Sequence, residues 1–130
     1  MAKWLFKTEP SEYSFAQLVK DGKTVWTGVK NALAQKHLRA IRKGDQILIY
    51  HTGAEKAVVG MASATSDAYP DQAASELCVV DIAPVKPLAH AVTLAVLKAD
   101  PGLADFALVR LPRLSVMPVA DAQWSLIVGS

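Results

Sequence analysis

The chain has 130 residues, a formal net charge of +2 and 52% hydrophobic residues. This length is typical of one folded domain, which we expect to span residues 1–130, and the apolar composition excludes a largely disordered chain. The small net charge does not demand a polyanionic partner, so any contact with nucleic acid must come from a local cluster of Lys and Arg.

The single cysteine and the N-terminal sequence indicate the compartment. Cys78 excludes an internal disulfide and lies in the apolar run Cys78-Val79-Val80, which suits a reducing cytoplasm. The start of the chain has no apolar signal-peptide core, and no apolar run is long enough to span a membrane. We therefore expect a soluble cytoplasmic protein.

The N-terminal segment predicts a strand followed by a short helix. The strand covers residues 3–8 and is stopped by Pro10. Ser14 and Gln17 have the spacing of a capping box, in which a hydroxyl precedes a glutamine by three residues. The helix is therefore expected from residue 14 to about residue 20, with its end at Gly22.

The next segment predicts a loop and a second helix. Residues 23–30 are expected to form a loop that carries Trp26. Asn31 can cap a helix that ends near Gly44. Ala34, Leu38 and Ile41 lie at helical spacing and form one apolar stripe.

The middle of the chain is rich in strand patterns. We expect strands over residues 46–51, 57–65 and 76–85, with Gly60 marking a bulge or a close backbone approach. Residues 52–55 form a turn and residues 69–71 a loop. Pro84 and Pro87 open a connection out of the third strand.

The last third predicts short elements. Thr93 can cap a helix through residue 98, residues 115–119 read as an edge strand, and Asp121 can cap a final helix that contains Trp124. The predicted strands and helices do not alternate as in repeated βαβ units, and no glycine-rich phosphate loop is present. The fold class is therefore α+β, a curved, mixed and mostly antiparallel sheet or open barrel with peripheral short helices.

Two segments place aromatic and polar groups where they can form a small-ligand pocket. The first is Lys7-Thr8-Glu9-Pro10, and the second runs from Trp26 to Asn31. Trp26 can stack a base, and an ionised Glu9 can accept from an exocyclic amino group. Alternatively, Glu9 makes a surface salt bridge with Lys7, and Asn31 is only a helix cap.

Basic residues gather on and around the second helix. The cluster comprises Lys30, Lys36, Arg39, Arg42 and Lys43, and Arg110 and Arg113 join it if the fold brings them round. The cluster is either a phosphate track or the solvated face of an amphipathic helix. His37, His51 and His90 lack metal-ligand spacing, and no Gly-x-Ser-x-Gly elbow is present, so we expect no metal, no cofactor and no catalysis.

Several short motifs occur in one particular order along nearly the whole chain. They are Lys7-Thr8-Glu9-Pro10, Trp26 with Gly28-Val29 and Asn31, Lys43-Gly44-Asp45, Tyr50-His51, Ala68-Tyr69-Pro70-Asp71 and Arg113-Leu114-Ser115-Val116. In this order they resemble the EVE-domain family, a branch of the PUA-like fold that is similar to YTH and ASCH domains. The chain departs from the family pattern at Thr27, where an Asp is frequent, and at Ala32-Leu33-Ala34-Gln35, where Tyr-Gln-Ala-Arg is usual.

The resemblance implies a nucleic-acid-binding module that takes one modified base of DNA or RNA, such as 5-methylcytosine, out of the stack and into an aromatic pocket. It also leaves an ASCH-like ribonuclease or a small-molecule or protein-interaction sensor as alternatives. The residues expected to contact the base are Lys7, Thr8, Glu9, Pro10, Trp26, Val29, Asn31 and His51. Those expected to contact phosphates are Lys30, Lys36, Arg39, Arg42, Lys43 and Arg113.

Overall fold

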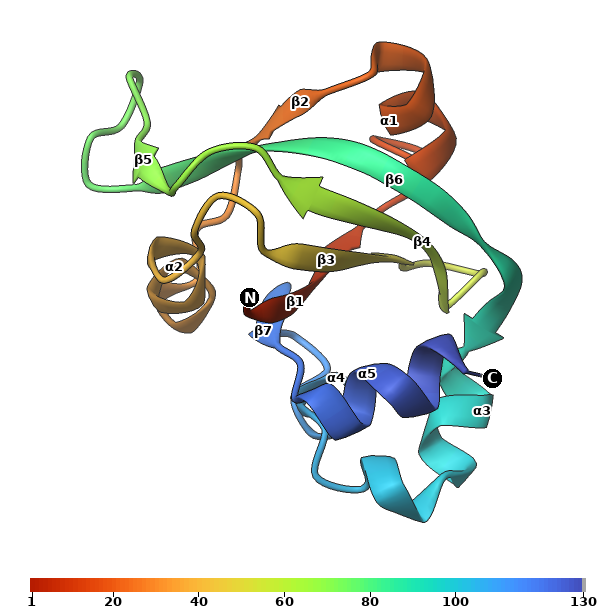
Figure 1. Cartoon of the computed structure of the whole chain (residues 1–130). Helices are drawn as coiled ribbons and strands as arrows, with labels where there is room; N and C mark the ends of the chain where they lie inside the picture. Colours follow the sequence, from red (N-terminus) through yellow and green to blue (C-terminus); the bar gives the residue numbers. More distant parts are fainter. Residues whose placement is uncertain (130) are drawn as a thin grey trace.

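A computed structural model describes residues 1–129 as a curved sheet with helices along its margins (Figure 1). The strands are β1 (Lys3–Thr8), β2 (Thr24–Trp26), β3 (Gln46–His51), β4 (Ala57–Ala64), β5 (Tyr69–Pro70), β6 (Cys78–Thr93) and β7 (Val116–Pro118). The helices are α1 (Phe15–Asp21), α2 (Ala32–Arg39), α3 (Leu94–Ala99), α4 (Ala107–Arg110) and α5 (Asp121–Val128), with a 3₁₀ turn at Pro101–Leu103.

The strands form a sheet of order β2-β6-β4-β3-β1-β7, with β5 added beside β6. Only the β1–β3 pair is parallel among the described strands, and the other pairs are antiparallel. This arrangement confirms the expected mixed α+β fold. Within residues 1–129 no helix has both the length and the apolar character needed to cross a bilayer.

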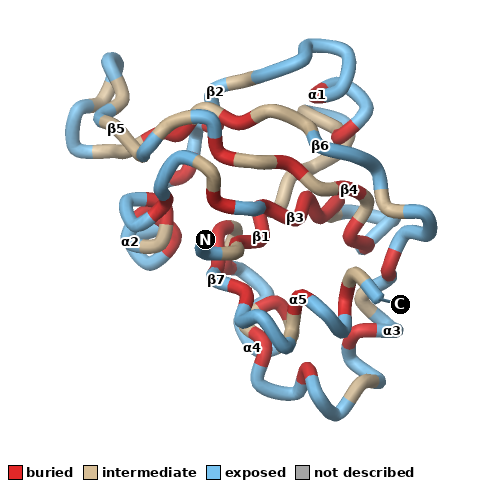
Figure 2. Tube along the Cα trace, viewed as in Figure 1, coloured by how far each residue is buried: buried red, intermediate tan, exposed pale blue. Residues whose placement is uncertain are grey.

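The core is built around β1 and β3 (Figure 2). Leu5 and Phe6 of β1 and Leu48 of β3 are fully buried. The predicted apolar stripe is confirmed at Ala34 and Leu38, which are buried on α2, whereas Ile41 is buried just beyond the end of the helix. Helix α2 thereby packs against β6 and β7 and fixes the position of the segment that precedes it.

Three of the four predicted helix caps are confirmed. The Ser14 hydroxyl accepts from the Gln17 N–H at 3.0 Å, and α1 ends at Gly22 in the left-handed region (φ 79°). The Asn31 side-chain carbonyl oxygen accepts from two backbone N–H groups of α2, each at 3.0 Å. Thr93 likewise accepts from the N–H of Val96 at 3.3 Å. Caps depend on neighbours in sequence, which is why sequence patterns find them.

Three predicted boundaries before residue 72 are wrong. Residues 23–30 are not all loop, because β2 forms there by pairing with β6, with Trp26 opposite Val80. Helix α2 ends at Arg39, a turn before Gly44, because the Arg42 N–H donates to the Asp45 carboxylate and redirects the chain. Tyr69 and Pro70 form a short strand rather than a loop, through pairing with β6.

Two further expectations in the second half are wrong. Strand β6 does not stop at the prolines but continues through Pro84 and Pro87 to Thr93, and its register with β4 shifts near them. Bulges of this kind let a strand absorb residues without an N–H. Asp121 is not a cap: Ala120 precedes α5, and the Asp121 carboxylate accepts from the Lys3 ammonium at 3.0 Å, which lowers the pKa of Asp121.

Gly60 lies beside the predicted bulge, and Phe15 of α1 packs directly against it. A Cβ at this position would lie 2.5 Å from two carbon atoms of the Phe15 ring. We expect Gly60→Ala to lower the free energy of unfolding by about 1–3 kcal/mol, the usual cost of overpacking. Urea denaturation measures the change. Adding Phe15→Leu to Gly60→Ala should recover part of the loss, and an unchanged midpoint for Gly60→Ala alone would contradict the close packing.

Candidate functional site

The end of β1 and the strand β2 enclose a cavity of about 420 Å³, the Trp26 cavity. Its lining includes Lys7, Thr8, Glu9, Trp26 and Val29, all of which the sequence predicts as site residues. Strand β2 lies at one edge of the sheet and β1 near the opposite edge. The curl of the sheet therefore brings the two motifs together, with the Phe6 and Trp26 rings 5.2 Å apart.

Trp26 forms an aromatic wall of this cavity and is also part of the core. Its exposure is 9%, and its ring packs between Phe6 and Tyr13. The Tyr13 ring meets the indole edge-on at 6.2 Å. Trp26 therefore lies in strand β2 and not in the expected loop, and the same indole has a packed side and a cavity side.

Lys7 supplies the cavity with a half-buried cation. Its ammonium donates to the carbonyl oxygen of Pro112 at 2.7 Å and lies 5.9 Å from the centre of the Tyr50 ring. Burial lowers the pKa of Lys7 from its usual value, because the charged form loses hydration. The ammonium has further donors, so it can also hold an acceptor from a ligand.

Glu9 and Thr8 are held by the surrounding backbone and side chains. The Glu9 carboxylate accepts from the Thr52 hydroxyl at 3.0 Å, and the Thr8 hydroxyl donates to the Tyr13 carbonyl at 2.6 Å. No ion pair between Glu9 and Lys7 is found in the described chain, so the simple salt-bridge alternative does not apply. A positioned carboxylate with free lone pairs can accept from a ligand amine.

The structure adds lining residues that were not among those expected to contact the base. They are Glu12, Tyr13, Thr24, Val25, Thr27, Gly28 and Ser115. Tyr13 offers a second ring, and its hydroxyl donates to Asp21 at 2.8 Å. Burial is the main cause that raises the pKa of Tyr13. The only signal for Tyr13 in the sequence is its place between the first motif and the capping box, which says nothing about where its ring lies.

Gln35, one of the departures from the expected family pattern, supports the cavity from behind. It is 2% exposed, and its side-chain amide donates to the Val29 carbonyl at 2.6 Å. The amide oxygen accepts from the Cys78 N–H at 2.8 Å. Gln35 therefore fastens the Trp26–Val29 segment to β6 and does not reach a ligand itself.

Asn31 and Arg113 lie together at a second cavity of about 310 Å³, the Asn31 cavity. The Asn31 side-chain oxygen already caps α2. The other lining residues are Leu33, Leu111, Pro112 and Leu114. Asn31 and Arg113 are therefore near residues of the Trp26 cavity in sequence, but neither of them lines that cavity.

His51 and Pro10 also lie outside the lining of the Trp26 cavity. The His51 Nε2 atom accepts from the Phe15 N–H at 3.0 Å, while Nδ1 lies 2.7 Å from a Glu55 carboxylate oxygen. Because Nε2 is the acceptor, the proton is on Nδ1. His51 therefore joins β3 to α1 and has a structural role in this arrangement.

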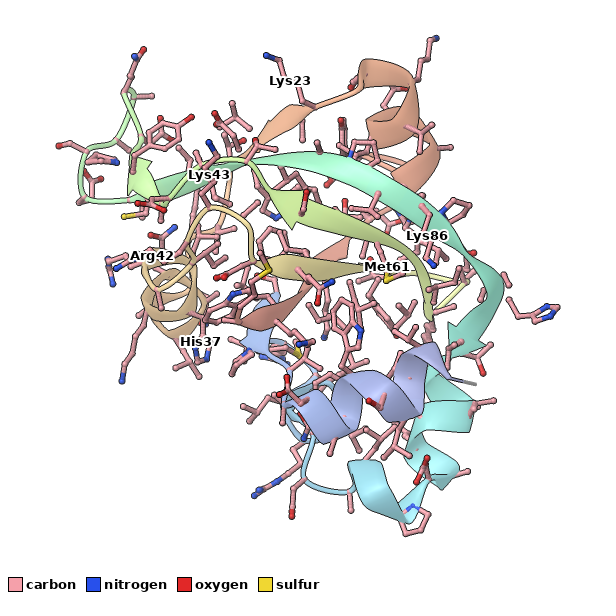
Figure 3. All side chains as sticks on the ribbon, in the orientation of Figure 1. Lys23, His37, Arg42, Lys43, Met61 and Lys86 are labelled. Atoms are coloured by element: carbon pink, nitrogen blue, oxygen red, sulfur yellow. The ribbon has the colours of Figure 1, made fainter. Side chains whose placement is uncertain are left out.

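The predicted phosphate-contacting residues are exposed. Arg42 and Lys43 lie in the segment that follows α2 and leads to β3 (Figure 3). The Arg42 guanidinium donates to the carbonyls of Arg39 and Ile41, so it also closes the end of the helix. Lys30, Lys36, Arg39 and Lys43 remain solvated, and none of them lines the Trp26 cavity. Among residues 1–129, no group of three or more metal-binding side chains is found.

Taken together, the curled sheet and its aromatic-walled cavity define a PUA-like α+β protein. The EVE domain model matches residues 2–130, and the chain belongs to the EVE domain family.

Known relatives share this fold. A Rhodopseudomonas palustris protein solved by NMR is 44% identical, with a TM-score of 0.94 over 99% of this chain and 92% of that one. Human thymocyte nuclear protein 1 is 26% identical over 97% of this chain and 72% of its own length. The crystal structure of human THYN1 in complex with DNA containing 5-methylcytosine has a TM-score of 0.91 at 22% identity, over 99% of this chain and 96% of that one.

An ASCH protein from Zymomonas mobilis is a more distant match in fold. Its TM-score is 0.56 at 14% identity, over 98% of this chain and 96% of that one. At this identity the likeness concerns the fold alone.

Proposed function

We propose that this chain binds nucleic acid by holding one modified base in the Trp26 cavity. The observation that carries the proposal is that Trp26, Lys7 and Glu9, which come from two separate motifs, line one cavity of about 420 Å³. This volume lies in the range of small-molecule sites, which combine apolar walls with a few placed polar groups.

Each wall of the cavity has a part in recognising the base. The Trp26 indole offers a stacking surface, and base–aromatic stacking contributes about 1–3 kcal/mol. Glu9 accepts from an exocyclic amine such as cytosine N4, and Lys7 donates to a base carbonyl. A methyl group on the base fills apolar space that an unmodified base leaves empty. The complex of human THYN1 with DNA containing 5-methylcytosine makes that base the first ligand to test.

A panel of short DNA and RNA oligonucleotides, each with one modified base, tests the proposal at two salt concentrations. We expect a preference for one modified base over its parent of about 1–3 kcal/mol, the size of one good base contact. Glu9→Gln should reduce this preference, because an amide has one acceptor oxygen where the carboxylate has two. Glu76→Gln is the control, since Glu76 is exposed and lies outside every cavity lining described above. Equal affinity for all bases would overturn the proposal.

An ASCH-like ribonuclease is the competing function, and Lys7 is the observation that favours it. Half-buried lysines with a lowered pKa are typical of catalytic sites. Against this, Lys7 and Glu9 are each bonded to another group, Pro112 and Thr52. Incubation with RNA and DNA, with and without divalent cations, should give no turnover. Cleavage that Lys7→Ala or Glu9→Ala abolishes would favour the enzyme.

A further inference from the structure

Another cavity, of about 310 Å³, shares Lys7 with the Trp26 cavity. We call it the Lys56 cavity, and its lining is Lys7, Tyr50, Thr52, Gly53, Lys56, Leu94, Lys98, Leu108 and Pro112. Three of these residues are lysines, and none is acidic. In the described part of the chain, none of the three lysines takes part in an ion pair. A concave surface whose cations lack anionic partners attracts an anion.

The fold holds Lys56 and Lys98 on the same side of the molecule. The Leu94 N–H donates to the Lys56 carbonyl at 2.8 Å, which ties the turn before β4 to the first residue of α3. Lys98 follows Leu94 by four residues, so both side chains lie on one face of α3. Lys56 itself has a positive φ of 45°, the only non-glycine residue of the described chain to do so.

The Lys56 cavity adjoins the Trp26 cavity through two connections. Lys7 lines both cavities. Glu9 of the Trp26 cavity accepts a hydrogen bond from Thr52 of the Lys56 cavity at 3.0 Å. The Glu9 carboxylate repels a phosphate from the boundary between the cavities, while the three ammonium groups attract it into the Lys56 cavity.

We propose that the Lys56 cavity binds a backbone phosphate next to the base that occupies the Trp26 cavity. The proposal rests on the function proposed above. It assigns the phosphate contact to Lys56 and Lys98, across the wall made by Lys7. The basic residues of α2, by contrast, line neither cavity. The bound nucleic-acid strand would then pass over the Lys7–Pro112 hydrogen bond, which lies between the two cavities.

The double variant Lys56→Gln/Lys98→Gln tests the phosphate site. We expect the slope of log affinity against log salt to become shallower by about 0.7–0.9 for each phosphate that the variant no longer neutralises. The preference for the modified base should stay unchanged. Lys20→Gln/Lys86→Gln removes the same charge from exposed positions that line neither the Trp26 nor the Lys56 cavity, and its slope should match the unmodified protein. Equal slopes for the two double variants would overturn the proposal.

Neutral methylphosphonate linkages locate the contact along the strand. One such linkage, placed on either side of the modified base, should weaken binding of the unmodified protein at one of the two positions. At that position the Lys56→Gln/Lys98→Gln variant should show no further loss, since the charge pair is already broken. Additive losses would show that the lysines contact some other group, which contradicts the proposal.

Inorganic phosphate separates this inference from the proposed function. In NMR titrations, phosphate should shift the backbone amide signals of Thr52, Lys56 and Lys98 in the unmodified protein and not in the double variant. If these shifts occur while no oligonucleotide shows base preference, the base-binding function is wrong and an anion site remains. If phosphate leaves the three signals unmoved and the salt slope is unchanged, the phosphate site is wrong.

Discussion

Asp45→Ala is expected to lower the free energy of unfolding by about 3–5 kcal/mol, because hydrogen bonds to a charged group contribute about 1.5–3 kcal/mol each. The Asp45 carboxylate is 5% exposed and accepts from the Trp4 indole N–H at 2.9 Å, the Arg42 N–H at 3.0 Å and the Ala2 N–H at 3.1 Å. Removal of the carboxylate leaves these donors without a partner. Thermal and urea unfolding measure the loss.

Asp67→Ala is the matched control for Asp45→Ala. Asp67 is exposed, and within residues 1–129 its carboxylate accepts one hydrogen bond, from the Lys43 N–H at 2.8 Å. We expect it to change stability by less than about 1.5 kcal/mol, as for one ordinary hydrogen bond. Asp45→Asn should fall between the two, because one amide oxygen cannot replace both carboxylate oxygens. Similar losses for Asp45→Ala and Asp67→Ala would contradict the role of Asp45 as a buried junction.

Trp26→Ala is expected to affect binding and stability together. Loss of stacking should weaken nucleic-acid binding by about 1–3 kcal/mol. Loss of the indole from between Phe6 and Tyr13 should lower the free energy of unfolding by about 3–5 kcal/mol, as for other buried Trp→Ala changes. Binding must be measured well below the melting temperature of the variant.

Trp124→Ala is the control that separates the two effects. Trp124 has the same 9% exposure, but it lies on α5 and does not line the Trp26 cavity. The Trp124→Ala variant should have a lower free energy of unfolding and an unchanged affinity for nucleic acid. Trp26→Phe should lose less of both, because a smaller ring still fills part of the space and stacks. A folded Trp26→Ala variant with full affinity would show that the indole does not stack a ligand.

The two motifs that form the cavity can be found in the sequence, but their geometry cannot. Lys7, Thr8 and Glu9 stand out as polar residues at a strand end, and Trp26 as an aromatic residue near a glycine. That Trp26 has a packed side follows from the curl of the sheet, which brings its ring against Phe6 of β1, a long-range contact without a local pattern. The polar side chains of Asn31 and His51 suit a ligand site, but local and long-range hydrogen bonds occupy them instead.

By itself, the sequence determined the features that depend on near neighbours. The caps Ser14, Asn31 and Thr93 and the apolar runs of β1 and β3 are of this kind, because cap hydrogen bonds and apolar runs involve residues only a few positions apart. Only the tertiary structure decided the contacts that the curl of the sheet creates. Gln35 is hydrogen-bonded to Cys78, Leu94 is hydrogen-bonded to Lys56, and Lys7 lines two cavities. Residues so far apart in sequence come together only when the strands pair and the sheet curls.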